Sequence, residues 1–411
     1  MTAGTPAKRR AVHQVLATLG YGDAIGNDVL GIQRALRGAG YPSDIFVETA
    51  DRRVEPLTRD FRELVQESHP DNLLIHHFSI GSKASRVAYA LPDRMLLVYH
   101  NITPPEFFVG IHKRLVRYCY HGLRELRAYV DRCDLAVGAS EFSRRELESL
   151  GFTRTGVLPV VPDFSHLDVR PNDVVAREFD DAWTNILFVG RVVPNKRIEH
   201  LIRFFAVYKT RFNPRSRLLI VGSSREFERY QTLLHALVAR LGVPDVHFSG
   251  HVTNEELTAY YDVADVFLCA SEHEGFCVPL VEAFYKRIPV LALARTAVPA
   301  TLDGAGVLYE QPDPGEVATL LDLVVSDTDL QAQVVASQDA ALDRLRRRDF
   351  AGAVLAAVDR VRQSPRLPAQ PVAPDFWHQF DTTERVEELR LMRPALYRAL
   401  PTAARASSIS E

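Results

Sequence analysis

Short apolar segments alternate with longer amphipathic segments along most of this chain, and a turn-rich stretch interrupts the alternation near its middle. Strands of a parallel sheet that is covered on both faces are short and apolar, and helices connect them. The first run comprises Val12–Thr18, Ile45–Val47, Asn72–His76, Met95–Tyr99 and Leu135–Val137, and ends with Gly156–Val161. The second run comprises Asn185–Val189, Arg217–Val221, Val246–Phe248, Val266–Cys269 and Val290–Ala292. The pattern predicts an α/β protein with two doubly wound parallel sheets.

The interruption predicts the domain boundaries. Residues 162–181 are rich in proline, aspartate and asparagine, which is typical of a connector. We expect Rossmann-like domains at 1–165 and 182–364, and a helical tail at 375–411 that packs back on the body after a proline-rich segment. A chain of 411 residues with 46% hydrophobic residues can build two such cores. Ligands bind at the carboxyl ends of parallel strands, so a central cleft between the two sheets is expected.

Composition excludes several classes of protein. The formal net charge of −3 gives no reason to expect nucleic acid as a partner. The four cysteines form no CxxC pair, which argues against a disulfide framework or a zinc site and favours a reducing, cytoplasmic compartment. No stretch approaches the roughly 20 apolar residues of a membrane-spanning helix. Residues 8–19 resemble a signal peptide only superficially, and a first strand is the better interpretation.

The segment Ser271–Ala283 predicts an anion site. It follows the expected strand Val266–Cys269 and opens a helix with Pro279 in its first turn, where a missing N–H costs nothing. Unpaired N–H groups at a helix start, together with the helix dipole, favour a bound anion. The backbone groups expected to face that anion belong to Phe276, Cys277 and Val278.

Two carboxylates flank this helix start. Glu274 precedes the helix and Glu282 lies about one turn inside it, so both can face one cleft on either side of bound phosphates. Without the strand–loop–helix context the same pair would be interpreted as a solvated helix face.

A second strand end carries fixed cations. The strand 185–189 is followed by Gly190 and Arg191, and Lys196 comes five residues after Arg191. A nucleotide diphosphate that leaves a sugar gains negative charge, and cations aimed at it stabilise that transition state. The alternative is that both cations are ordinary surface residues.

A metal could do the same work, and Asp327-Thr328-Asp329 is a literal DxD sequence. It follows a helical pattern, and Ser326 or Asp327 is placed to cap the next helix. We interpret it as capping chemistry and predict no metal site.

These motifs resemble the family 4 retaining glycosyltransferases. The resemblance rests on Gly190-Arg191 with Lys196, on Phe248–Val252, on Leu257, Tyr260 and Ala264–Val266, and on the segment from Glu274 to Glu282. It implies the GT-B fold, in which the C-terminal domain holds a nucleotide diphosphate sugar as co-substrate, the N-terminal domain binds the acceptor, and no other cofactor is needed. It also implies that Arg191 and Lys196 bind the diphosphate, Glu274 the donor sugar and Glu282 the ribose, with Val252 near the base. One departure is Cys277, where glycine is common.

The N-terminal half supplies two further candidates. Glycines 20, 22 and 26 follow the first strand, and Gly22 is a candidate donor contact that the resemblance places across the cleft from the phosphates. His100 follows the strand 95–99, a position typical of a ligand-facing side chain, and the resemblance puts it near the donor sugar. A buried, hydrogen-bonded structural histidine is the alternative for His100.

The segment 105–132 interleaves aromatic and aliphatic residues with Lys113, Arg114, Arg117, Arg124 and Arg127. Such a mixture can contact an anionic membrane, but a core helix with a solvated basic face is the more common structure. The inner face of the cytoplasmic membrane is therefore an open alternative as a partner.

The motifs together favour a hexosyltransferase. We expect it to move a hexosyl group from a nucleotide diphosphate sugar to a glycan or lipid-linked acceptor in polysaccharide or glycolipid synthesis, with Glu274, His100, Arg191 and Lys196 as its catalytic residues. A nucleotide-sugar epimerase and a sugar-nucleotide-binding protein without catalysis remain alternatives. The donor base, the sugar and the acceptor are not specified by the sequence.

Overall fold

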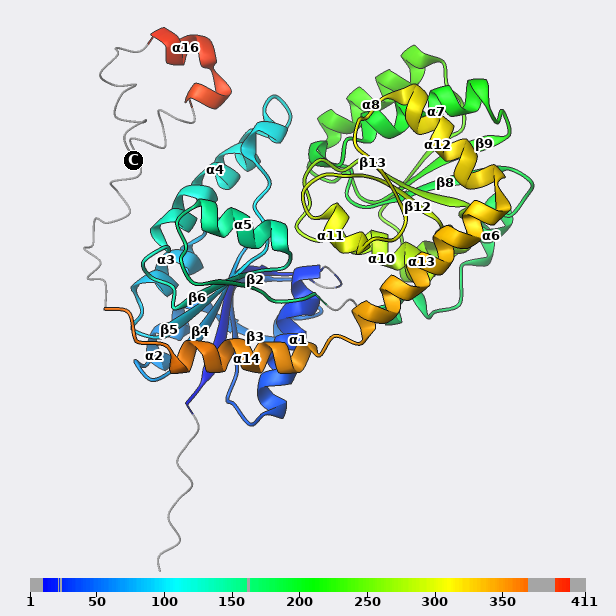
Figure 1. Ribbon diagram of the computed structural model, residues 1–411. Helices are drawn as coiled ribbons and strands as arrows, with labels where there is room; N and C mark the ends of the chain where they lie inside the picture. The colour runs from blue at the N-terminus through cyan, green and yellow to red at the C-terminus, as the bar shows by residue number, and fades with distance from the viewer. Residues whose placement is uncertain (1–9, 21, 23, 161–162, 369–388, 400–411) are drawn as a thin grey trace, which may run out of the picture. The chain divides into compact units, whose positions relative to one another are not determined.

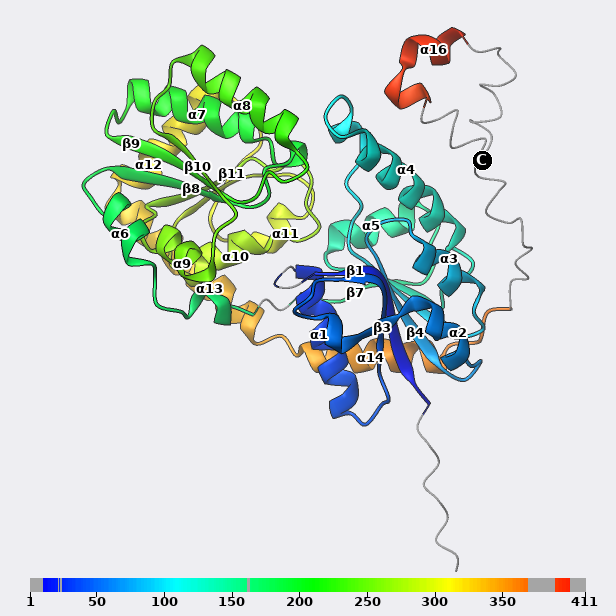
Figure 2. The same ribbon diagram turned by 180° about the vertical axis from the view of Figure 1, so that it is seen from behind.

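The protein was described from a computed structural model that covers residues 10–20, 22, 24–160, 163–368 and 389–399 (Figure 1). The chain divides into two compact units. The N-terminal unit consists of residues 1–160 and 349–411, and the C-terminal unit consists of residues 161–348. Each unit contains one sheet with helices on both faces (Figures 1 and 2). The predicted fold class, α/β with two Rossmann-like units, is confirmed.

The sheet of the N-terminal unit has seven parallel strands in the order β3-β2-β1-β4-β5-β6-β7. Its elements are β1 (Val12–Leu19), α1 (Ala24–Gly38), β2 (Ile45–Ala50), β3 (Thr58–Asp60), α2 (Leu64–Glu67), β4 (Leu73–Phe78), α3 (Lys83–Ala90), β5 (Arg94–Tyr99), α4 (Lys113–Ala128), β6 (Leu135–Gly138), α5 (Glu141–Ser149), β7 (Thr155–Val157) and α14 (Phe350–Gln363). A short helix, α16 (Pro394–Ala399), lies near the end of the chain.

The sheet of the C-terminal unit has six parallel strands in the order β10-β9-β8-β11-β12-β13. Its elements are α6 (Asp173–Phe179), β8 (Thr184–Val189), α7 (Ile198–Arg211), β9 (Ser216–Val221), α8 (Glu228–Leu241), β10 (Val246–Gly250), α9 (Asn254–Asp262), β11 (Val266–Cys269), α10 (Val278–Tyr285), β12 (Val290–Leu293), α11 (Val298–Leu302), β13 (Val307–Tyr309), α12 (Pro314–Ser326) and α13 (Thr328–Arg346). The strand order reverses between β8 and β11, and this is the point at which such sheets bind ligands.

Helix α14 corrects the expected domain boundary at residue 364. It belongs to the N-terminal unit, where Val354, Val358 and Val361 are buried in the same cluster as strand residues of β1, β4, β5 and β6. Arg94 of β5 also donates hydrogen bonds to the carbonyl oxygens of Arg362 (3.2 Å) and Ser364 (3.0 Å). The amphipathic period of a helix predicts that it covers a sheet but does not say which sheet, so sequence order was misleading here.

The expected connector also differs from the structure. Residues 165–167 form a 3-10 turn and α6 follows, so the stretch has structure of its own. The side chains of Phe164, Leu167, Val175 and Phe179 are buried in the main core of the C-terminal unit. Most of the connector is therefore part of the C-terminal unit, because its apolar residues find a core there. Of the expected helical tail at 375–411, residues 389–399 are described, and they are helical at 389–392 and in α16. The other residues of that tail lie outside the described residues.

Candidate functional site

An ion pair between Lys196 and Glu274 lies at the carboxyl edge of the C-terminal sheet. Lys196 ends a 3-10 turn that follows β8, and Glu274 lies in the loop after β11. Strands β8 and β11 are direct neighbours in the parallel sheet, so the segments that follow them emerge side by side. The topology thus brings together two residues that are 78 positions apart in the sequence.

Two hydrogen bonds through Asn195 hold the two loops together. The side-chain amide of Asn195 donates to the carbonyl oxygen of His273 (3.0 Å), and the N–H of Glu272 donates to the carbonyl oxygen of Asn195 (2.9 Å). Asn195 is buried, so these hydrogen bonds do not compete with bulk water. The sequence motifs did not indicate this asparagine, which we identify as the link between the two loops.

The ion pair is shielded from solvent. The Lys196 and Glu274 side chains are 17% and 9% exposed. Burial opposes the charge on Lys196, but the attraction and hydrogen bond of Glu274 outweigh that effect and raise the pKa of the lysine. Lys196 therefore keeps its positive charge at the site, which is the state that an anionic ligand requires.

The start of α10 presents backbone donors. Within the residues that the structure describes, the N–H groups of Phe276, Cys277 and Val278 donate to no protein acceptor. Cys277 caps the helix in the left-handed region, with φ of 75°, which explains why glycine suits this position. These are the backbone groups that the sequence analysis expected to face an anion, and N–H groups at a helix start favour such a ligand.

The loop after β12 supports this helix start. The N–H of Glu274 donates to the Thr296 hydroxyl (3.0 Å), and the Thr301 hydroxyl donates to the carbonyl oxygen of Phe276. Both ends of the segment 274–276 are therefore fixed by threonines, one from the loop after β12 and one from α11, and the adjacent N–H groups are held in place without a ligand.

Arg191 lies just after β8, and its guanidinium is free to bind an anion. The side chain is exposed, its guanidinium lies 5.6 Å from the centre of the Phe227 ring, and no carboxylate of the described residues pairs with it. Gly190, just before it, has φ of 151°. The N–H groups of Gly190 and Val192 bond to the carbonyl oxygens of Val221 and Ser223 (both 2.9 Å), so this loop lies directly against the loop after β9.

Glu282 has a different set of partners from Glu274. The Tyr261 hydroxyl donates to one carboxylate oxygen (2.8 Å), and His166 Nε2 lies 3.0 Å from the other. Glu282 is buried, yet each oxygen has a second lone pair that can accept a hydroxyl of a ligand. His166 comes from the expected connector and was not among the predicted site residues, because a lone histidine in a proline-rich stretch gives no motif.

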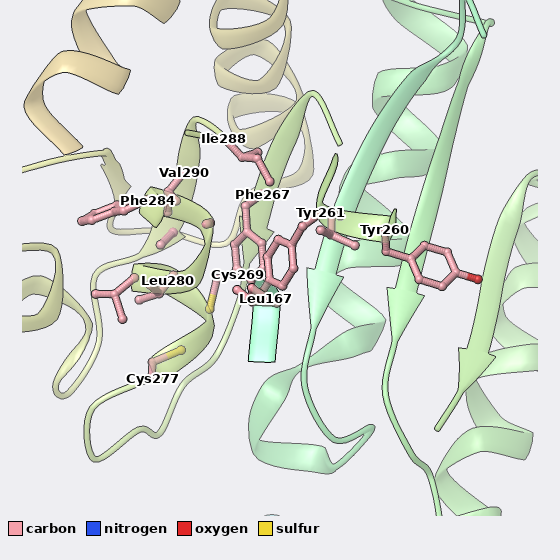
Figure 3. Close-up of a cluster of buried hydrophobic side chains, with 14 of the residues drawn as sticks. Leu167, Tyr260, Tyr261, Phe267, Cys269, Cys277, Leu280, Phe284, Ile288 and Val290 are labelled. Carbon is pink, nitrogen blue, oxygen red and sulfur yellow. The ribbon is translucent and has the colours of Figure 1, made fainter. Parts of the chain in front are cut away.

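A cluster of buried apolar side chains packs between α10 and the sheet, next to the candidate site. Cys269 at the end of β11, and Cys277 and Leu280 at the start of α10, belong to one buried cluster with Tyr261 and Phe267 (Figure 3). Val252, in the loop after β10, is partly buried and packs against the same cluster. The cluster fixes the depth of α10 relative to the sheet, and with it the position of the helix start.

The protonation state of His166 follows from its contacts. Its Nδ1 lies 3.1 Å from the carbonyl oxygen of Asp163, while its Nε2 faces the Glu282 carboxylate. Both partners are acceptors, and only the imidazolium carries a proton on each ring nitrogen. The hydrogen bond to Glu282 accordingly raises the pKa of His166 above its ordinary value of 6.5, although burial opposes the shift.

We expect an NMR titration to give His166 a pKa above 6.5, and we expect Glu282→Gln to lower it. Since the pKa is raised by folding, the stabilisation is fully present below the pKa of the unfolded chain and is lost as the pH rises through the folded value. His247 of the same unit serves as a control, because burial lowers its pKa. A His166 pKa that does not respond to Glu282→Gln would contradict the ion pair.

The N-terminal unit holds the other two candidates. His100 is partly exposed just beyond β5, at the carboxyl edge of its sheet, and its Nε2 is 2.9 Å from His77 Nδ1. Gly22 has φ of 72°, and no atom lies within 4 Å of where a Cβ would stand. Both follow strand ends, as predicted, and neither belongs to the compact unit that contains Lys196 and Glu274.

The first aspartate of the DxD sequence caps a helix. Asp327 accepts hydrogen bonds from the N–H groups of Asp329 (3.0 Å) and Leu330 (2.9 Å) at the start of α13. The capping interpretation is confirmed. In the part of the chain that the structure describes, no group of three or more His, Cys, Asp or Glu side chains is arranged to hold a metal ion.

Helix α4 carries the basic, aromatic segment. Val116, Cys119 and Leu126 are buried, so the helix packs on the core through an apolar face, as the commoner of the two interpretations predicted. Tyr118 and Val109 are 45% and 38% exposed. Among the described residues, no helix is both long and apolar enough to span a bilayer.

Comparison with known proteins adds a family match over part of the chain and a fold. Residues 170–338 match the family of glycosyl transferases group 1. The O-antigen chain mannosyltransferase B of Escherichia coli is 27% identical over 232 residues, which are 54% of this chain and 58% of that protein. The chain spans less than two thirds of the length of the curated relatives that it matches first.

Two solved structures resemble the whole fold. Sucrose-phosphate synthase from Thermosynechococcus elongatus has a TM-score of 0.65 at 18% identity, covering 86% of this chain and 99% of that one. Anabaena HepE in complex with UDP and glucose has a TM-score of 0.63 at 18% identity, covering 87% and 100%. At this identity the likeness establishes the fold, which is GT-B.

Proposed function

We propose that this chain is a family 4 retaining glycosyltransferase. It moves a hexosyl group from a nucleotide diphosphate sugar to a glycan or lipid-linked acceptor in the synthesis of a cell-surface polysaccharide or glycolipid. The observation that carries the proposal is the Lys196–Glu274 ion pair beside three unpaired N–H groups at the start of α10. The match of residues 170–338 to group 1 glycosyltransferases supports the same activity.

The C-terminal unit binds the donor and the N-terminal unit binds the acceptor. The diphosphate lies against the N–H groups of residues 276–278, between Lys196 and Arg191, and close to the loop at Gly190. Glu274 accepts hydroxyls of the donor sugar, and Glu282 accepts hydroxyls of the ribose. Val252 contacts the base through its backbone. The family resemblance assigns His100 to the sugar and Gly22 to the phosphates.

The chemistry requires charge and position from the protein. The bond between the sugar C1 and the diphosphate oxygen breaks while the acceptor hydroxyl oxygen attacks C1 from the same face. The leaving phosphate oxygen takes the proton of that hydroxyl, so the configuration at C1 is retained. Lys196, Arg191 and the helix start stabilise the charge that develops on the leaving group, and they need no reorganisation to do so.

The two substrates define the expected location of the enzyme. A nucleotide sugar is a cytoplasmic metabolite, so the enzyme acts in the cytoplasm. A lipid-linked acceptor would bring it to the inner face of the cytoplasmic membrane. The basic residues of α4, with Tyr118 exposed beside them, supply a surface for anionic headgroups.

The activity is tested by turnover with UDP-, GDP- and ADP-linked hexoses and a panel of glycan acceptors. Donors are first selected by thermal shift, because a ligand that binds the native state raises the melting temperature. NMR of the product gives the configuration at C1, and inversion would contradict the retaining assignment. Conversion of a sugar nucleotide without an acceptor would favour the epimerase, and binding without turnover of any pair would favour the non-catalytic protein.

We expect transfer to be independent of divalent metal, because fixed cations and N–H donors already face the proposed diphosphate site and Asp327 of the DxD sequence is used as a helix cap. Excess EDTA should leave the initial rate unchanged. If EDTA abolishes transfer and Mn²⁺ or Mg²⁺ restores it, a metal rather than Lys196 and Arg191 carries the leaving group.

Glutamine substitutions should separate the two glutamates. Glu274→Gln should lower kcat about 10-fold and raise the donor KM by a smaller factor, because contacts to the reacting sugar tighten as charge develops there. Glu282→Gln should mainly raise the donor KM. Glu272→Gln is the matched control, since Glu272 lies in the same loop but pairs with Arg197. An unchanged kcat for Glu274→Gln would remove this residue from the chemistry.

A further inference from the structure

A chain of polar side chains crosses three neighbouring strands of the N-terminal sheet. Gln14 lies in β1, His77 lies in β4, and His100 follows β5 directly. His77 pairs in register with Val98, so His100, two residues further on, lies on the same face of the sheet as His77. Gln14 and His77 are buried, whereas His100 is partly exposed at the edge. The buried Gln14 is thus connected, through His77, to a residue that a ligand can reach.

The first link fixes the Gln14 side chain. Its Nε2 donates to the carbonyl oxygen of Val29 in α1 (3.2 Å). A carbonyl oxygen only accepts, so the amide nitrogen must be on that side and Oε1 must face His77. Oε1 in turn lies 2.9 Å from His77 Nε2 and can only accept, so His77 Nε2 carries a proton.

The second link fixes His100. Burial, together with the neighbouring His100 and His76, holds the pKa of His77 well below its ordinary value, so His77 is neutral. With its proton on Nε2, its Nδ1 is bare and accepts from His100 Nε2, which is 2.9 Å away. Burial also lowers the pKa of His100 to about 4, so this ring carries only the Nε2 proton.

This series of hydrogen bonds ends at an acceptor atom that has no donor. His100 Nδ1 is bare in this arrangement, and no donor among the described residues is bonded to it. A bare ring nitrogen accepts from a hydroxyl and finds no partner in a carboxylate, which has no proton to give.

We propose that Gln14 and His77 are positioning residues that hold His100 in the Nε2–H tautomer, so that its Nδ1 is a dedicated acceptor for a sugar hydroxyl. The site then favours neutral hexoses over uronates or deoxy sugars at the hydroxyl that meets His100. This inference rests on the proposed transferase function for the identity of the ligand, whereas the tautomer itself is a property of the free protein.

The tautomer is measured directly on the full-length free protein. Two-dimensional ¹⁵N–¹H spectra of protein labelled with ¹⁵N-histidine distinguish protonated from bare ring nitrogens, and a His100→Asn variant assigns the signals. We expect a bare Nδ1 and a protonated Nε2 on His100 near pH 7. A protonated Nδ1 would overturn the proposal whatever the enzymatic activity.

An almost isosteric substitution should invert the tautomer. In Gln14→Glu, a carboxylate beside His77 favours the imidazolium, whose Nδ1 proton then points at His100 Nε2 and moves the His100 proton to Nδ1. We expect kcat/KM to fall about 10- to 100-fold, as for a hydrogen bond to substrate that can no longer form. The spectra of the variant should show the inverted His100 ring.

Gln33→Glu is the matched control. Gln33 is also buried, and its Nε2 also donates to a backbone carbonyl oxygen, that of Ser43 (3.0 Å), but it has no link to the two histidines. The proposal is overturned if Gln14→Glu inverts the ring while its kcat/KM matches that of Gln33→Glu. If wild-type protein transfers no hexose at all, the proposed function fails, and the spectra still decide the tautomer independently.

Discussion

Lys196→Met should lower kcat by at least about 100-fold, the largest loss of turnover that we expect from a single substitution. Lys196 is the one predicted diphosphate ligand that the described structure holds in an ion pair at the start of α10, and its raised pKa keeps it charged. Removal of a fixed charge that faces a developing oxyanion typically costs about 100- to 1,000-fold in rate. Initial rates at saturating donor and acceptor measure the effect.

A stability effect must be separated from this loss. Removal of one partner of a buried ion pair typically costs about 3–5 kcal/mol, because the remaining charge is left without compensation. The double variant Lys196→Met/Glu274→Gln removes that charge, so it should recover much of the melting temperature and none of the turnover. Recovery of both would mean that Lys196 acts only on Glu274.

Lys286→Met is the matched control for the lysine. Lys286 is 16% exposed, close to the value for Lys196, and it is also ion-paired, with Asp262 at 2.9 Å, but it lies at the end of α10 away from the anion site. Its substitution should leave kcat within about 2-fold, because Lys286 pairs with Asp262 and not with a residue of the proposed anion site. An equal fall in kcat for both lysine variants would remove Lys196 from the diphosphate site.

Gly222→Ala should destabilise the C-terminal unit by about 3–5 kcal/mol and abolish transfer in the protein that remains folded. Gly222 follows β9, has φ of 150°, and a Cβ added there would lie 2.0 Å from the carbonyl oxygen of Gly190. No flexible side chain can move to relieve that contact, because the atom it meets is backbone. The loop that carries Arg191 and Lys196 would have to shift. Urea unfolding and donor binding measure the two consequences.

Gly242→Ala separates conformational strain from the close approach. Gly242 has φ of 60°, also in the left-handed region, but no atom lies within 4 Å of where its Cβ would stand. It should therefore cost only the about 1–2 kcal/mol of a left-handed alanine and leave donor binding unchanged. Equal urea-unfolding midpoints for the two variants would show that the close contact between Gly190 and Gly222 does not contribute to stability.

Local patterns determined the fold class and the parts of the proposed donor site. The alternation of apolar and amphipathic segments predicted two parallel α/β units, because strand and helix periods are properties of neighbouring residues. The same holds for the helix start at 276–278 and for Asp327, which were predicted from a strand–loop–helix sequence and from capping chemistry and are both found in the structure. Such features depend on contacts within a few positions, so a sequence displays them directly.

Contacts between distant segments were decided only by the tertiary structure. The neighbouring positions of β8 and β11 brought Lys196 to Glu274, and the packing of an apolar face moved α14 to the N-terminal unit. The sequence showed neither His166 as the partner of Glu282 nor Gly222 as the neighbour of Gly190. It also could not distinguish a structural His100 from a ligand-facing one. Gln14, 63 positions from His77, supplies the hydrogen bond that orients the pair. The protonation and direction of a polar group depend on which groups surround it in space, and strand order sets those surroundings.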